Sequence, residues 1–263
     1  MNIGFIGAGN MATAMITGAL QSKKVKADNI WISNRSQEKL DAFQNCHTTT
    51  DNCTVASNVD ILVLSIKPQV YEQVLQQIQK DIHDHTLVVS IAPNWTLTSL
   101  QKALQPTTKI VRIMPNTPAM VLEGMSAFVC NENCDQNDVE KIQEFCSYFG
   151  VATQVKEEQM DAVVALSGSS PAYAFSFLNA MIEKGQEMGM SYQQSKLLAA
   201  QSLKGAASLI LQSDQSASVL KQNVCSPGGT TIEAVTILDD NHFESIIQEA
   251  MEACKNKAEK MKV

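Results

Sequence analysis

A glycine-rich segment near the start of the chain has residue types that could bind an anion. Gly7-Ala8-Gly9-Asn10-Met11-Ala12 follows an apolar run at residues 2–6 and precedes an amphipathic stretch at residues 11–21. Between a strand and a helix, the first glycine permits a tight turn, the second lets a pyrophosphate approach, and the small alanine lets helix and strand pack. Free N–H groups at the helix start would hold the anion. An ordinary strand-to-helix turn is the alternative, but the context favours a dinucleotide site.

The end of the second predicted strand, residues 30–33, distinguishes between dinucleotides. In an NAD site this place carries an Asp or Glu that binds the ribose 2′-hydroxyl. Here the sequence is Ser33-Asn34-Arg35-Ser36, without a carboxylate. Hydroxyl, amide and guanidinium donors suit a 2′-phosphate, so the segment favours NADPH, with NADH as the alternative. A solvated turn that caps the next helix would explain the same residues without a ligand.

A third segment, late in the chain, combines glycines with hydroxyl side chains. Cys225-Ser226-Pro227-Gly228-Gly229-Thr230-Thr231 stands at the start of a predicted helix over residues 230–238. Backbone N–H groups and hydroxyls gathered at a helix start suit a small anion such as a carboxylate. A capped helix with a glycine hinge fits the spacing equally well.

The first half of the chain alternates short apolar runs with amphipathic stretches, as in βαβ units that build a parallel sheet. Several apolar runs consist of Val, Ile and Leu without alternation, so we expect a doubly wound α/β sheet with helices on both faces. The predicted strands are residues 2–6, 30–33, 61–65, 87–90, 110–113, 126–130 and 151–155. The predicted helices are residues 11–21, 37–43, 69–79, 97–104 and 137–149.

Prolines follow three of these strands, in Lys67-Pro68, Ala92-Pro93-Asn94 and Met114-Pro115-Asn116-Thr117-Pro118. Ligands of open α/β sheets bind beyond the carboxyl ends of the strands. Rigid turns at this edge would form a floor for ribose and nicotinamide, although each proline alone could simply mark a loop.

The second half reads as all helix. Apolar residues recur there at three- and four-residue spacing, so we predict an α/β domain over residues 1–156 and a helical domain over residues 157–263. The helix after Pro171 is apolar on nearly every face and must be covered on all sides, which predicts a homo-oligomer through this domain. The predicted helices are residues 160–166, 171–188, 191–211, 218–224, 230–238 and 242–261.

The composition is that of a folded protein with small-molecule or protein partners. Of 263 residues, 44% are hydrophobic, and the net charge of −7 argues against binding to nucleic acid. No apolar run is long enough to span a membrane. Seven cysteines without a secretory leader pattern predict reduced thiols in the cytoplasm. Cys130 and Cys134 lack a histidine at zinc-finger spacing, so no metal site is predicted.

These motifs together resemble the pyrroline-5-carboxylate reductase family, and the resemblance covers the whole chain. It also rests on Lys67-Pro68-Gln69, on residues 114–119 and 226–234, and on Ser167-Gly168-Ser169-Ser170-Pro171-Ala172-Tyr173. The resemblance implies an N-terminal Rossmann domain, a helical dimerisation domain, and reduction of the cyclic imine 1-pyrroline-5-carboxylate to L-proline with NAD(P)H, the last step of proline biosynthesis.

The resemblance also implies roles for individual residues. The substrate carboxylate would be held by Ser226, Gly228, Gly229 and Thr230, and the hydroxyl of Thr231 would face the ring nitrogen as the catalytic group. Motifs and resemblance together predict cofactor contacts from Ile6, Gly7, Ala8, Gly9, Asn10, Met11, Ala12, Ser33, Asn34, Arg35, Asn52, Ser65, Ile66, Lys67, Pro68, Ala92, Pro93 and Asn116, with Asn52 near the adenine end.

Some positions depart from the family pattern. Many relatives have His-Pro-Gly where this chain has Ser216-Ala217-Ser218-Val219, and Asp214 only loosely matches an acidic residue there. Gln222 stands where Asp is frequent, and Asn94 where Gly is frequent. These differences concern loops more than the reaction.

Two other functions fit the sequence less well than imine reduction. A β-hydroxyacid dehydrogenase needs a lysine in the helix after its glycine motif, and residues 171–177 contain none. A non-catalytic dinucleotide sensor would have no use for the anion-binding segment. A protonated imine is already electrophilic, so its reduction needs no metal or buried histidine, which fits four histidines that lie outside every motif.

Overall fold

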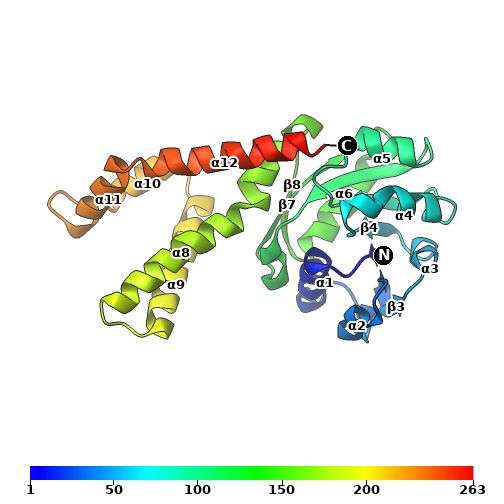
Figure 1. The fold of residues 1–263 in the computed structure, drawn as a ribbon, viewed down its shortest axis with the longest axis horizontal. Helices are drawn as coiled ribbons and strands as arrows, with labels where there is room; N and C mark the ends of the chain where they lie inside the picture. Colours follow the sequence, from blue (N-terminus) through cyan, green and yellow to red (C-terminus); the bar gives the residue numbers. More distant parts are fainter. Residues whose placement is uncertain (263) are drawn as a thin grey trace. The chain divides into compact units, whose positions relative to one another are not determined.

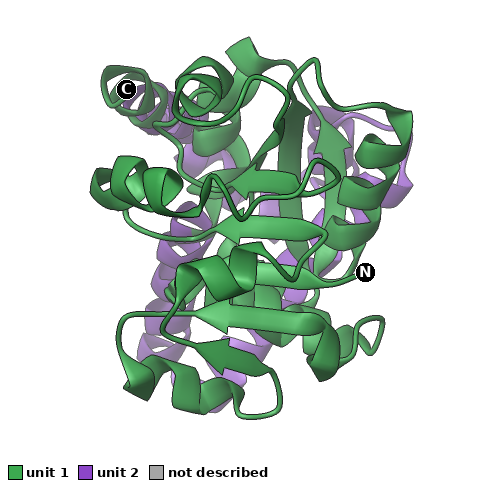
Figure 2. Cartoon of the chain, turned by 90° about the vertical axis from the view of Figure 1, so that its right-hand side faces the viewer, with its two compact units in different colours: residues 1–171, 254–263 green, residues 172–253 purple. Residues whose placement is uncertain are grey.

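A computed structural model describes residues 1–262 of the chain (Figure 1). Figure 2 shows its two compact units: residues 1–171 with 254–263, called unit 1, and residues 172–253, called unit 2. The predicted domains, residues 1–156 and 157–263, are not the same division as these compact units, and the domain boundary after residue 156 stays a prediction. No helix among the described residues is long and apolar enough to cross a membrane.

Unit 1 contains an eight-stranded sheet in the order β3-β2-β1-β4-β5-β6-β7-β8. β7 runs antiparallel to β6, and all other neighbouring pairs are parallel. Sequence order runs outward from β1 in both directions, so the predicted doubly wound fold is confirmed. The strands are β1 (Ile3–Ile6), β2 (Ile30–Ser33), β3 (His47–Thr49), β4 (Ile61–Leu64), β5 (Leu87–Ser90), β6 (Lys109–Met114), β7 (Gly124–Cys130) and β8 (Gly150–Gln154).

Helices cover both faces of this sheet. Every residue of β1, β4 and β5 is buried, and alternate side chains enter two separate cores. Phe5 and Val63 belong to one core, and Leu62 and Leu64 to the other. The helices of unit 1 are α1 (Asn10–Ser22), α2 (Gln37–Leu40), α3 (Asn52–Ala56), α4 (Tyr71–Ile78), α5 (Leu97–Ala103), α6 (Gln136–Ser147) and α7 (Met160–Val163).

The two cores take different helices. Ile16 of α1 and Phe145 of α6 pack in the first core, while Leu75 and Ile78 of α4 and Leu100 of α5 pack in the second. Each such side chain contributes about 1.5–3 kcal/mol on burial. The amphipathic pattern of α4 therefore fixes which of its faces is covered and leaves its polar face available.

The sequence prediction missed β3 and α3. β3 is a three-residue His-Thr-Thr strand that is largely exposed, and α3 has only five residues. Neither is long enough to show a hydrophobic period. The predicted helix at residues 37–43 is α2 followed by a 3-10 turn, Asp41–Phe43, and the one at residues 160–166 is α7 followed by a π-helix, Val164–Gly168.

Unit 2 is helical, as the sequence predicts. Ser191 begins the second of its helices with a capping box, in which its hydroxyl accepts from the backbone N–H of Gln194 and the Gln194 side chain accepts from the Ser191 N–H. Phe177 and Phe243 pack together with ring centroids 6.2 Å apart. The helices are α8 (Ser170–Glu187), α9 (Tyr192–Gln212), α10 (Ala217–Asn223), α11 (Thr230–Asp240) and α12 (Phe243–Lys260), of which α8 and α12 extend into unit 1 along the chain.

Candidate functional site

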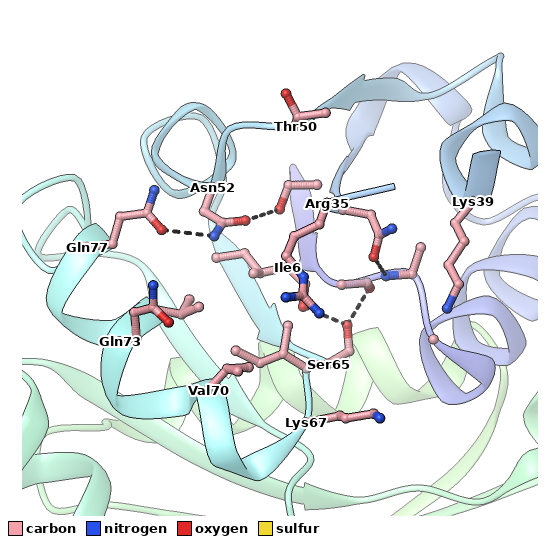
Figure 3. A pocket seen from close by; sticks show the side chains of 17 residues that line it. Ile6, Arg35, Lys39, Thr50, Asn52, Ser65, Lys67, Val70, Gln73 and Gln77 are labelled. Atoms are coloured by element: carbon pink, nitrogen blue, oxygen red, sulfur yellow. Dashed lines mark hydrogen bonds between the residues drawn. The ribbon is translucent and has the colours of Figure 1, made fainter. Parts of the chain in front are cut away.

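A pocket of about 430 Å³ opens in unit 1 at the carboxyl ends of β1, β2 and β4 (Figure 3). This is the edge where doubly wound sheets bind ligands, beside the strand at which the strand order reverses. The pocket is lined by Ile6, Gly7, Ala8, Gly9, Ser33, Asn34, Arg35, Lys39, Thr50, Asn52, Ser65, Ile66, Lys67, Val70, Gln73, Val74 and Gln77.

The glycine-rich turn forms one wall of the pocket. Gly7 has φ of +102°, and a Cβ there would lie 2.6 Å from the carbonyl oxygen of Ser65, so only glycine fits. The backbone N–H of Gly7 donates to the Ser33 carbonyl at 2.8 Å, which joins β1 to β2. A Cβ on Gly9 would meet nothing nearer than 3.8 Å, so this residue faces open space that a ligand can occupy.

The N-terminus of α1 supplies the free backbone N–H donors that the sequence predicts. Gly9 is the N-cap residue and supplies no side-chain acceptor, and the first bond back to it comes from the Thr13 N–H at 2.9 Å. The N–H groups of Asn10, Met11 and Ala12 therefore precede the helical hydrogen-bond ladder. With the positive end of the helix dipole, they suit a bound anion.

Three cationic side chains and no acidic ones are among the described residues that line the pocket. They are Arg35, Lys39 and Lys67. This local excess of positive charge occurs in a chain whose net charge is −7. A second, shallow cavity of about 370 Å³ is lined by Asn34, Arg35, Ser36 and Lys39. The predicted segment after β2 therefore forms a cationic surface suited to a phosphate.

Asn34 connects this cationic surface to the glycine turn. Its Oδ1 accepts from the N–H of Ala8 at 3.3 Å, and its Nδ2 donates to the Ser36 carbonyl at 3.0 Å. Lys39 was not predicted. It lies in the four-residue helix α2 that follows the Asn34-Arg35-Ser36 segment, and no motif of the sequence marks it.

Polar amides and two valines line the far end of the pocket. Asn52 is the first residue of α3, and Asp51 caps that helix by accepting from the N–H groups of Cys53 and Thr54 at 3.2 and 2.9 Å. Hydrogen bonds from the Thr54 side chain and backbone lower the pKa of Asp51, so it stays ionised as a cap. The lining residues that the sequence did not reveal here are Thr50, Val70, Gln73, Val74 and Gln77.

Seven predicted cofactor contacts are not among the residues that line this pocket: Asn10, Met11, Ala12, Pro68, Ala92, Pro93 and Asn116. Ala12 and Ala92 are buried. The amide of Asn116 bonds within unit 1, since its Nδ2 donates to the Ser167 carbonyl at 3.1 Å and its Oδ1 accepts from the Met125 N–H at 2.9 Å. A cofactor role for these residues stays a prediction.

An ion pair between a buried arginine and a partly exposed glutamate fixes the loop that carries Pro93. Arg112 on β6 donates to Glu157 at 2.5 Å and to the Pro93 carbonyl at 2.9 Å. The same Glu157 oxygen accepts from the N–H of Leu97 at 3.1 Å. The predicted proline turn after β5 is therefore held by side-chain hydrogen bonds as well as by its own ring.

The glycine-threonine segment in unit 2 begins α11. Gly228 has φ of +69°, and the N–H of Gly229 donates to the Ser226 carbonyl at 3.0 Å, which closes a turn before the helix. Gly229 is the N-cap residue and makes no side-chain cap. Thr230 and Thr231 are exposed within the single chain. An accessible helix therefore starts at Thr230, the position that the sequence predicts, while the anion-binding role of this segment stays a prediction.

No group of three or more His, Cys, Asp or Glu side chains within residues 1–262 could hold a metal ion. The fold and the pocket define a class of protein, an α/β protein with a dinucleotide-type site, followed along the chain by a helical unit. Residues 2–94 match the family described as NADP oxidoreductase, coenzyme F420-dependent. Residues 157–261 match the family described as pyrroline-5-carboxylate reductase dimerisation.

Comparison with individual proteins is more specific. Pyrroline-5-carboxylate reductase of Escherichia coli is 38% identical over 262 residues, which cover 98% of this chain and 97% of that protein. Human pyrroline-5-carboxylate reductase 2 is 36% identical over 260 residues, which cover 96% of this chain and 81% of that protein. The chain therefore belongs to the pyrroline-5-carboxylate reductase family.

Solved structures of relatives share the fold. The crystal structure of Plasmodium falciparum pyrroline carboxylate reductase with NADP bound has a TM-score of 0.92 at 30% identity and covers 100% of this chain and 98% of that one. The Coxiella burnetii pyrroline-5-carboxylate reductase structure has a TM-score of 0.90 at 34% identity, with the same coverage.

Proposed function

We propose that this chain reduces 1-pyrroline-5-carboxylate to L-proline with NADPH, the last step of proline biosynthesis. The observation that carries the proposal is that one chain of this family has two accessible groups of hydrogen-bond donors, of different design, that would each suit an anion. One is the cationic pocket of unit 1, and the other is the glycine-flanked start of α11. An oxidoreductase that acts on a small ring acid needs both, one for the dinucleotide and one for the substrate carboxylate.

The residues of unit 1 fit a dinucleotide with a 2′-phosphate. Open space at Gly9 and the N–H groups of Asn10, Met11 and Ala12 suit the pyrophosphate. Arg35 and Lys39 suit the 2′-phosphate, since a guanidinium and an ammonium group replace the carboxylate of an NAD site. Ser33, Asn34, Ser65 and Lys67 would contact the ribose and phosphate oxygens. We assign Pro68, Ala92, Pro93 and Asn116 to the nicotinamide side on the resemblance alone, with NADH as the alternative cofactor.

The start of α11 fits the substrate carboxylate. The uncapped N–H groups after Gly229 carry the positive end of the helix dipole, and Ser226 and Thr230 add hydroxyl donors. The carboxylate is therefore fixed by charge-assisted hydrogen bonds, which orient the ring.

Thr231 is the residue that we assign to the reacting nitrogen. When bound, NADPH supplies the hydride that the imine carbon accepts. The Thr231 hydroxyl hydrogen-bonds the ring nitrogen and orients or relays a proton to it. Because a threonine hydroxyl is a poor acid, the proton comes ultimately from solvent or from an imine that binds already protonated.

The helical region is assigned to dimerisation. Residues 157–263 would form the substrate-binding and dimerisation domain, and residues 1–156 the dinucleotide-binding domain. We propose a homodimer or an assembly of dimers, since apolar side chains on α8 and α9 are exposed in the single chain. The odd number of cysteines supports a reducing compartment such as the cytoplasm.

The direct test is the loss of near-ultraviolet absorbance of NADPH or NADH when 1-pyrroline-5-carboxylate is added to the purified chain. We expect oxidation of NADPH in step with L-proline formation. Proline or a ring-acid analogue should compete with the substrate and slow this reaction. Cofactor binding without any turnover of the imine would contradict the proposal and favour a dinucleotide-sensing role.

A further inference from the structure

Three side chains at the far end of the pocket form a continuous chain of hydrogen bonds, visible in Figure 3. The Ser33 hydroxyl donates to Asn52 Oδ1 at 2.7 Å, and Asn52 Nδ2 donates to Gln77 Oε1 at 3.1 Å. Ser33 ends β2, Asn52 begins α3, and Gln77 lies in the last turn of α4. The Asn52 amide is therefore held at both of its ends.

Asn52 needs this support because its own helix is short. α3 has five residues, too few to be stable without packing. With Ser33 on its oxygen and Gln77 on its nitrogen, the Asn52 side chain is held in place from two sides by residues of two other elements.

The position of Gln77 follows from the face of α4 that remains uncovered. Val74 and Ile78 of α4 are buried in the second core, whereas Gln73 and Gln77 are exposed and line the pocket. Residues four apart lie on one face of a helix, so both glutamines face the same end of the pocket. Gln76, between them in sequence, is exposed but does not line the pocket.

The chemistry of this end suits a purine. If the dinucleotide binds as proposed above, its pyrophosphate lies at the glycine turn and its adenylate ribose beside the end of β2. The adenine then extends past Ser33, where Val70 and Val74 offer apolar contacts to its flat faces and the amides of Asn52, Gln73 and Gln77 face its polar edges.

We propose that Gln77 is a positioning residue for the adenosine half of the cofactor and that it acts by holding the amide of Asn52. The inference rests on the proposed dinucleotide site. Gln77 is remote along the cofactor from the nicotinamide, so its contribution is to binding and not to hydride transfer. Gln77 lies on α4, which contributes no charged side chain to the pocket lining. We therefore expect Gln77 to have no part in recognising the 2′-phosphate and to support the binding of NADPH and NADH equally.

The test is calorimetric binding of 2′,5′-ADP, which carries the adenosine half without nicotinamide, to Gln77→Leu. We expect binding about threefold to tenfold weaker than in the original chain, as for loss of one hydrogen bond. The KM for NADPH and for NADH should rise by that same factor with kcat unchanged. Gln76→Leu is the matched control and should change neither the binding nor the KM.

Action through Asn52 is tested by adding Ser33→Ala. If both side chains hold one amide, the double variant loses less affinity than the product of the two single losses. If the two losses of affinity multiply independently, Gln77 does not act through Asn52. Unchanged binding in Gln77→Leu, or an equal loss in Gln76→Leu, would also overturn the proposal. A chain that fails to bind 2′,5′-ADP before any substitution would instead contradict the proposed cofactor site.

Discussion

Unit 1 and unit 2 bury their apolar side chains to very different degrees. The sheet of unit 1 fills two cores within the chain. Among the described residues 172–253, only Ser195 and Ala199 are buried, while Phe175 is 63% exposed, Leu197 68% and Leu211 86%. Both units are rich in apolar residues, so composition does not explain the difference.

The difference lies in what covers each element. A sheet with helices on both faces completes its core with local βαβ connections. Helices that expose large apolar side chains at many positions must bury them against another surface. Unit 1 therefore buries its apolar side chains within the chain, whereas unit 2 leaves many of them exposed for another surface to cover. Unit 1 offers cationic side chains to a ligand, and unit 2 offers backbone N–H donors.

The largest effect, complete loss of the homo-oligomer, is expected when charged side chains are placed on the exposed apolar surface of unit 2. The double variant Phe175→Glu/Leu197→Glu should abolish the homo-oligomer, because an unpaired charge buried in an interface costs several kcal/mol. Light scattering should then report the protomer mass of 28.7 kDa. Val151→Glu, at a 66% exposed position of unit 1, is the control and should leave assembly intact. If the unsubstituted chain already scatters with the mass of a protomer at micromolar concentration, unit 2 does not bury its apolar side chains in a homo-oligomer.

The next largest effect is expected at the start of α11. Thr231→Ala should reduce turnover by roughly tenfold to a thousandfold, if its hydrogen bond to the ring nitrogen strengthens in the transition state. Thr236→Ala removes a hydroxyl from the same helix that donates only to the Ile232 carbonyl, at 2.9 Å, and should keep its turnover. Steady-state kinetics with saturating NADPH would measure both, and unchanged turnover in Thr231→Ala would reject the assigned role.

A smaller effect is expected in the cofactor preference set by unit 1. Arg35→Ala should lower kcat/KM for NADPH by about tenfold to a hundredfold, as for loss of a hydrogen bond to a charged group. NADH lacks the 2′-phosphate, so its kcat/KM serves as the internal control and should change little. Equal losses with both cofactors would show that Arg35 does not read the 2′-phosphate.

The smallest effect concerns the stability of unit 1 itself. Burial raises the pKa of Asp138, but hydrogen bonds from Lys109, at 2.7 Å, and from the Asp135 N–H, together with nearby lysine charges, outweigh it and lower the pKa overall. A lowered pKa stabilises the fold above the carboxyl's unfolded pKa, about 3.9, and this stabilisation disappears as the pH falls through the folded-state pKa.

Asp138→Asn should therefore reduce the free energy of unfolding at neutral pH by about 1–2 kcal/mol. The deficit should shrink as the pH falls towards the folded-state pKa. Urea unfolding at several pH values measures it, with Glu140→Gln on the exposed face of α6 as the control. A deficit that is independent of pH would show that the carboxylate charge is not what stabilises this helix start.

The sequence alone determined the elements whose signal is local. β1, β4 and β5 were predicted to within one residue, because buried parallel strands are unbroken apolar runs. The glycine turn at Gly7 and the capping box at Ser191 were readable because a positive φ and a helix N-cap each demand particular residues.

Only the tertiary structure decided which of these segments share a site. Lys39, Gln73 and Gln77 carry no motif, and they line the pocket only because β2, β1 and β4 are neighbours in the sheet. Asn116 was predicted from a motif, yet the fold engages its amide in hydrogen bonds to the backbone at Met125 and Ser167. Residue type and spacing specify local conformation, whereas proximity between distant segments follows from strand pairing and burial, which depend on the whole chain.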